Sequence, residues 1–121
     1  MIQGYFIEEL PAFEITVAWK EGIEHARVIL DTGFSGDLQL SPSLVDKLGL
    51  RASDVTSATL ANGERFKIPT TIAIAAMEGS GKPVHILISD STPLAGIGFL
   101  SKFGYKAIVD CKHKKVTLQK A

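Results

Sequence analysis

An aspartate follows directly on an apolar run, where a charged side chain is costly. Residues 28–30 are Val-Ile-Leu and predict a buried strand, and Asp31 stands at its end. An ionised carboxylate in that place must be hydrogen-bonded or neutralised. Thr32 and Ser35 supply hydroxyl groups that can satisfy it, while Gly33 allows a tight turn and the close approach of another chain or a ligand. Asp31 is therefore the first candidate for a catalytic side chain; the alternative is an Asx-type turn that only closes the strand.

A predicted β-hairpin places Asp31 at the end of its second strand. Residues 13–19 alternate between apolar and polar types for most of their length, which is typical of a half-buried strand. Residues 20–22 predict a turn, and residues 24–30 predict the returning strand that ends at Asp31.

A short helix is expected soon after the aspartate. Residues 38–40 predict a short strand, after which Ser41 fits a helix N-cap and Pro42 fits the first helical position. Gly49 suits the position just past the end of this helix.

Two further hairpins are expected in the middle of the chain. Residues 56–60 and 65–75 flank Asn62-Gly63, and this dipeptide is the strongest short signal for a hairpin turn. Residues 72–75 and 84–88 predict a third strand pair.

The C-terminal part predicts a second helix and a closing hairpin. Residues 97–103 fit a short amphipathic helix with Gly104 at its end, and residues 107–111 and 116–119 fit two paired strands. We interpret Cys111 as a small buried hydrophobic residue of a strand rather than a catalytic thiol. Many short strands with two short helices predict an all-β, barrel-like domain.

These motifs carry a resemblance to a known family. Asp31-Thr32-Gly33 after an apolar strand resembles the active-site triplet of pepsin-like and retropepsin-like aspartic proteases, and Phe34-Ser35-Gly36 resembles the small retropepsin-like proteases of microbial chromosomes. Leu94-Ala95-Gly96 is similar to the segment that precedes the short helix of these enzymes, and Asn62-Gly63 is placed as the tip of their flap hairpin. The resemblance implies a retropepsin-like acid-protease barrel with a flap and one or two short helices, in a single domain over residues 1–121.

The resemblance also implies an activity, that of a cofactor-free aspartic endopeptidase. Two carboxylates share one proton in such enzymes; one is the general base on water and the other protonates the carbonyl oxygen. The chain has one Asp-Thr-Gly, so a homodimer must bring two copies of Asp31 together at its axis. The resemblance implies three groups of supporting residues. Thr32, Gly33 and Ser35 belong to the loop, and Thr32 would be hydrogen-bonded across the axis. Leu94, Ala95 and Gly96 would lie near the site, and Ala61, Asn62 and Gly63 over the bound peptide or protein substrate.

One alternative for the site is weaker, one feature of the family is missing, and one alternative function stays open. Asp90 could be a second acid within the chain, but it lacks a following glycine and fits a turn. Retroviral members of the family often have an Arg after the helix-preceding glycine, where it pairs with an acid; this chain has Ile97 there. Because fold does not fix function, a catalytically weak or inactive binding or dimerisation module is the alternative to the enzyme.

Composition excludes several classes of partner. The chain of 121 residues has 13 basic and 13 acidic side chains, so no net field favours nucleic acid or an anionic membrane. A single cysteine cannot form an internal disulfide, and no basic leader precedes an apolar core, so we expect a cytoplasmic protein. His25, His85 and His113 are scattered and have no Cys or acid at ligand spacing, so we expect no metal site.

Overall fold

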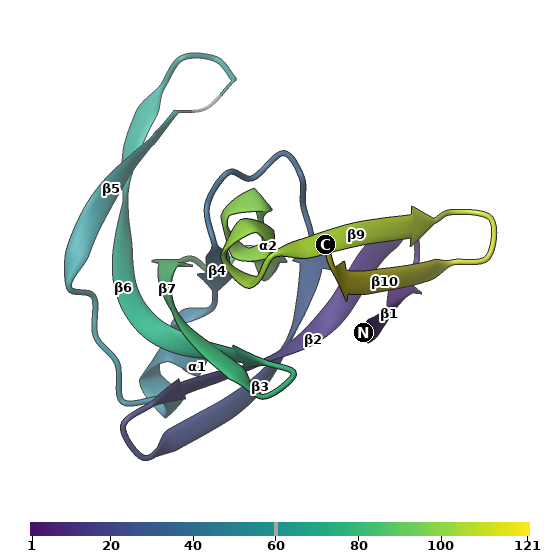
Figure 1. The fold of residues 1–121 in the computed structure, drawn as a ribbon. Coiled ribbons are helices and arrows are strands. Elements are labelled where there is room, and N and C mark those ends of the chain that lie inside the picture. Colours follow the sequence, from purple (N-terminus) through teal and green to yellow (C-terminus); the bar gives the residue numbers. More distant parts are fainter. Residues whose placement is uncertain (60) are drawn as a thin grey trace.

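A computed structural model of the chain describes residues 1–59 and 61–121 (Figure 1). In these ranges, ten strands form one mixed sheet, and two short helices pack against it. In chain order the elements are β1 (Ile2–Ile7), β2 (Leu10–Trp19), β3 (Gly22–Leu30), β4 (Leu38–Leu40), α1 (Pro42–Lys47), β5 (Asp54–Thr59), β6 (Arg65–Met77), β7 (Ser80–Ile88), β8 (Leu94–Ala95), α2 (Ile97–Phe103), β9 (Tyr105–Asp110) and β10 (Lys115–Lys120).

The sheet closes on itself into a barrel. Its strands run in the order β5-β6-β7-β4-β8-β3-β2-β1-β10-β9, and β2 pairs with β6 as well as with β3. The six strands from β6 to β2 therefore form a ring. Closure of a sheet in this way removes unpaired edges from the ring. The prediction of an all-β barrel with two short helices is confirmed.

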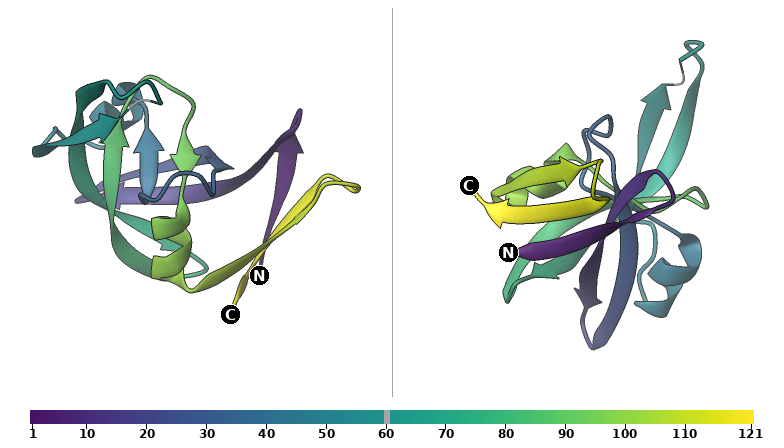
Figure 2. Two further views of the ribbon diagram at one scale, coloured as in Figure 1. Left: turned by 90° about the horizontal axis from the view of Figure 1, so that it is seen from above. Right: turned by 90° about the vertical axis from the view of Figure 1, so that its right-hand side faces the viewer.

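Two parts of the sheet extend beyond the ring. The β5–β6 hairpin projects away from the barrel, as the upper left of Figure 1 shows, and it corresponds to the predicted hairpin with Asn62-Gly63 in its turn. On the other side of the ring, β1, β10 and β9 continue the sheet beyond β2. Both termini lie side by side in this second extension, where β1 pairs with β10 (Figure 2).

An aromatic group packs α2 onto the barrel. Phe99 is fully buried, with its ring centroid 5.9 Å from that of Phe13 and 4.9 Å from that of Phe103. Phe103 in turn stacks on Tyr105, with 6.0 Å between their centroids. This packing fixes α2, and therefore the segment that precedes it, relative to the ring.

Both helices begin and end as the sequence predicts. The Ser41 side chain accepts a hydrogen bond from the Leu44 N–H at 3.2 Å, so it caps α1. Gly104 ends α2 in the left-handed conformation with φ of 66°, which glycine adopts without steric penalty.

The sequence interpretation was wrong about Cys111, which is exposed. Strand β9 ends one residue earlier than predicted, because Asp110 begins the turn to β10. The Asp110 carboxylate accepts a hydrogen bond from the His113 N–H at 3.0 Å and bonds the His113 ring at 2.8 Å. That turn leaves Cys111 at its surface.

Other differences concern the ends of the chain and of one hairpin. Strand β1 was not predicted, because most of its residues are half-buried and show no clear two-residue alternation. The strand predicted over residues 56–60 is observed to Thr59, and Leu60 lies outside the described residues. Within the described ranges, neither helix is long and apolar enough to cross a membrane.

Candidate active site

The ring places Asp31 beside the predicted Leu94-Ala95-Gly96 segment. Strand β3 runs parallel to β8, with Leu30 opposite Ala95, and the Asp31 N–H donates to the Ala95 carbonyl at 3.0 Å. Ala95 also pairs with Leu38 of β4 and is fully buried between the two strands. Two segments more than sixty residues apart in the chain are thus brought together at one end of the barrel.

The Asp31 carboxylate takes part in a local turn and keeps one oxygen available. Its Oδ1 accepts a hydrogen bond from the Gly33 N–H at 2.9 Å, which is an Asx-type turn. The Phe34 N–H donates to the Asp31 carbonyl at 3.1 Å and tightens the same turn. Asp31 is half-buried, and Thr32 is exposed next to it. Among the described residues, the hydrogen bonding of this carboxylate involves Oδ1, so the Asx turn and a catalytic role are compatible.

The loop of residues 31–37, here the Asp31 loop, is bonded to the start of α2. Helix α2 has no side-chain cap, so its first N–H groups need other acceptors. Carbonyl groups of the Asp31 loop supply them. Gly96 donates to Asp37 at 3.0 Å, Ile97 donates to Phe34 at 2.9 Å, and Gly98 donates to Gly36 at 3.0 Å. The loop and the helix therefore hold each other in register.

Gly96 is required by this close approach. A Cβ atom at position 96 would collide with the carbonyl oxygens of Phe34 and Gly36. It would also lie 2.7 Å from the Phe34 ring. The two oxygens belong to backbone that is already hydrogen-bonded to α2, so they cannot easily move. The structural reason for glycine in the Leu94-Ala95-Gly96 segment is thus the space that the loop occupies.

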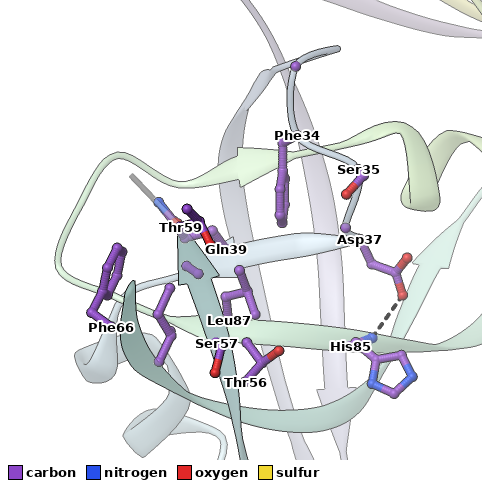
Figure 3. Close-up of a pocket in the computed structure, with 14 residues that line it drawn as sticks. Phe34, Ser35, Asp37, Gln39, Thr56, Ser57, Thr59, Phe66, His85 and Leu87 are labelled. Atoms are coloured by element: carbon purple, nitrogen blue, oxygen red, sulfur yellow. Dashed lines mark hydrogen bonds between the residues drawn. The ribbon is translucent and has the colours of Figure 1, made fainter. Parts of the chain in front are cut away.

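A cavity of about 540 Å³ separates the Asp31 loop from the β5–β6 hairpin; we call it the loop–hairpin cavity (Figure 3). Pairing of Thr56 with Ile68 and of Ala58 with Phe66 gives the hairpin one face toward it. The side chains that make its apolar walls are Phe34, Phe66, Ile68 and Leu87. The polar side chains that line it are Ser35, Asp37, Gln39, Thr56, Ser57, Thr59 and His85. A concave site with apolar walls and a few polar groups suits an extended peptide with apolar side chains.

The predicted site residues divide into two groups. Gly33 and Ser35 line the loop–hairpin cavity, whereas Asp31 and Thr32 stand at the start of the same loop and are not among the lining residues. Ala61, Asn62 and Gly63 do not line it in the described structure; they form the exposed turn beyond the stem of the hairpin. There the Asn62 side chain accepts a hydrogen bond from the Glu64 N–H at 2.9 Å. The stem residues of β5 and β6, not the tip, make the cavity wall.

Sequence reasoning missed Asp37. It is buried with 8% of its side chain exposed, and its Oδ2 lies 2.5 Å from the Lys102 Nζ and 2.9 Å from the His85 N–H. A weaker form of the signal that singled out Asp31 is present, since Asp37 stands directly before strand β4, whose Leu38 and Leu40 are fully buried. The partner lysine, sixty-five residues further on, has no such signal in the sequence.

Comparison with known proteins agrees with this architecture. No protein-family model and no curated protein matches the chain. Among solved structures, it is similar to a retropepsin-like aspartic protease from Rickettsia conorii, with a TM-score of 0.66 and 17% sequence identity. The match covers 97% of this chain and 88% of that one. The chain therefore has a retropepsin-like fold, and at this level of identity the likeness concerns the fold alone.

The close contact between the Asp31 loop and Gly96 predicts that alanine destabilises the protein more at position 96 than at position 36. We expect Gly96→Ala to lower the free energy of unfolding by about 1–3 kcal/mol, because its Cβ meets fixed backbone. Gly36→Ala is the matched control, since the nearest atoms to its Cβ, at 2.5 and 2.6 Å, belong to the Phe34 side chain, which can rotate. Urea denaturation of both variants measures the difference. Equal losses in the two variants would contradict the proposed role of the backbone contact.

Proposed function

We propose that the protein is an aspartic endopeptidase of the retropepsin type, folded as one domain over residues 1–121 and active as a homodimer. The observation that carries the proposal is the position of the Asp31-Thr32-Gly33 loop. It lies at the end of a buried strand of a retropepsin-like barrel, and from Gly33 onward the same loop forms one side of a concave cavity with apolar walls. The substrate would be an extended segment of a peptide or protein that lies between this loop and the β5–β6 hairpin.

The chemistry requires two carboxylates that hold one proton between them. An ionised Asp31 removes a proton from water, and the resulting nucleophile attacks the carbonyl carbon of the scissile peptide bond. The protonated Asp31 of the second copy gives its proton to the carbonyl oxygen. Collapse of the tetrahedral intermediate then breaks the C–N bond. The amine nitrogen takes the proton that the first Asp31 gained from water, and one hydroxyl group of the intermediate returns its proton to the second Asp31, so the pair again holds one proton. Repulsion between two close carboxylates keeps one of them protonated.

A homodimer supplies the second carboxylate in this proposal. A two-fold axis beside the exposed Thr32 would bring both Asp31 loops together, and Thr32 hydroxyl groups can bond across it. The sheet order leaves β5 and β9 as its two edges. Since β5 lines the loop–hairpin cavity, β9 is the edge that we expect a second copy to cover, and its Ile108 and Val109 side chains are 42% and 40% exposed.

Replacement of the proposed catalytic group tests the activity. We expect Asp31→Asn to abolish cleavage of a peptide library at acidic pH while the fold persists, because the substitution removes both acids of a homodimer at once. Asp90→Asn is the matched control, since Asp90 is an exposed aspartate in a bend. Cleavage that survives Asp31→Asn would refute the proposed catalyst, and a wild type inactive at every pH would favour the binding or dimerisation module.

Mixing of the two forms tests whether the site is shared between chains. At constant total protein, an equal mixture of wild type and Asp31→Asn should retain about one quarter of the wild-type activity after subunit exchange, because mixed dimers have one acid. An active monomer would retain half. Sedimentation of the wild type at micromolar concentration gives the independent measure, and a strict monomer with full activity would exclude the homodimer mechanism.

The pH dependence of cleavage follows from the shared proton. We expect kcat/KM to describe a bell with its optimum on the acidic side of neutral. On the acid limb both carboxylates hold protons and no base is available; on the alkaline limb the last shared proton leaves and no acid remains. The two limbs belong to the pair rather than to one side chain. A rate that is constant from acid to alkaline pH would be inconsistent with a carboxylate pair.

A further inference from the structure

A buried ion pair lies at the far end of the Asp31 loop. Asp37 ends the loop, and its Oδ2 lies 2.5 Å from the Nζ of Lys102 on α2 and 2.9 Å from the His85 N–H on β7. Lys102 also donates to the Pro83 carbonyl of β7 at 3.2 Å. Figure 3 shows the Asp37 carboxylate directed toward the backbone of His85, and both residues line the loop–hairpin cavity. One carboxylate therefore joins the loop, the helix and a strand of the ring.

The burial of this pair distinguishes it from the other ion pairs. Four ion pairs form among the residues that the structure describes, and only this one has a buried carboxylate, with 8% of the Asp37 side chain exposed. A buried carboxylate is costly unless a cation and hydrogen bonds compensate for the lost water. Lys102 is 35% exposed, so solvent screens part of the attraction. For stability alone, a pair of apolar side chains would serve as well.

The ion pair fixes the orientation of helix α2 relative to the Asp31 loop. The hydrogen bonds from the start of α2 hold the middle of the Asp31 loop, at Phe34 and Gly36. Lys102 reaches back from the last turn of the same helix to the end of the loop. The Oδ1 of Asp37 meanwhile fills the space beside Gly98, where a Cβ atom would collide with it. Helix and loop are thus fixed to each other at both ends, and rotation or sliding of α2 would break the pair.

We propose that Lys102 and Asp37 are positioning residues for the carboxylate of Asp31. Their ion pair locks α2 and β7 to the Asp31 loop, and the loop in turn sets the orientation of Asp31 and of the Phe34 wall of the loop–hairpin cavity. The proposal rests on the proposed peptidase activity for its catalytic consequence. The mechanical part, that the pair holds the loop on α2, is independent of that activity.

Substitution of the lysine separates positioning from stability. Lys102→Met keeps most of the alkyl chain and removes the charge, and we expect kcat to fall about tenfold to a hundredfold while KM changes much less. Lys102→Arg should restore most of the loss, because it restores the cation. Lys47→Met is the matched control: Lys47 occupies the last turn of α1, as Lys102 does in α2, but has no such carboxylate partner among the described residues. Its kcat should equal that of the wild type.

A double-mutant cycle tests the pairing itself. Asp37→Asn should lower kcat like Lys102→Met, and the double variant should be no worse than either single variant, since each removes the same interaction. Additive losses would show that the two residues act separately and would overturn the proposal.

Amide hydrogen exchange gives the readout that does not depend on cleavage. In Lys102→Met we expect the amides of Ile97 and Gly98, which donate to the Asp31 loop, to exchange about tenfold faster while amides of β2 in the ring are unchanged. Uniformly faster exchange, with kcat reduced only in proportion to the folded fraction, would mean a structural role and would overturn the proposal. If the wild type cleaves no peptide, the proposed function fails, and the exchange comparison still decides whether the pair holds the loop.

Discussion

The hydrogen bonds between the Asp31 loop and the first turn of α2 are the contact on which the rest of the site depends. A helix start leaves N–H groups without partners, and a tight loop leaves carbonyl groups without partners. Here each set satisfies the other, at 2.9 to 3.0 Å for the bonds to Phe34, Gly36 and Asp37. Because the contact is backbone to backbone, it tolerates no side chain at position 96. The direction of Asp31 and the wall of the loop–hairpin cavity both follow from it.

Closure of the ring makes this contact possible. Strand β8 has only two residues, yet it lies between β3 and β4 and delivers the chain directly into α2. The aromatic packing of Phe99 then holds α2 on the barrel while its first turn faces the loop. The cavity therefore lies between two walls that are held in different ways. Hydrogen bonds to helix α2 hold the Asp31 loop, whereas strand β5 of the hairpin pairs with β6 alone.

Local signals in the sequence determined most of the elements. Asn62-Gly63 identified a hairpin turn, Ser41 and Pro42 identified a helix start, and Gly104 identified a helix end, because each of these acts through bonds within a few residues. Alternation failed where strands are half-buried on both faces, as in β1, and where a side-chain hydrogen bond ended a strand early, at Asp110 ahead of Cys111.

The sequence by itself determined the fold class, through the pattern of many short strands with two short helices, and the position of Asp31 at the end of a buried strand, through the apolar run that precedes it. Only the tertiary structure decided which residues surround that strand end. It brought β5 and β6 stem residues, rather than the Ala61–Gly63 turn, to the cavity, and it joined Asp37 to His85 and Lys102 across 48 and 65 residues of chain. No local rule predicts such partners, because they meet only after the ring has closed and α2 has packed on it.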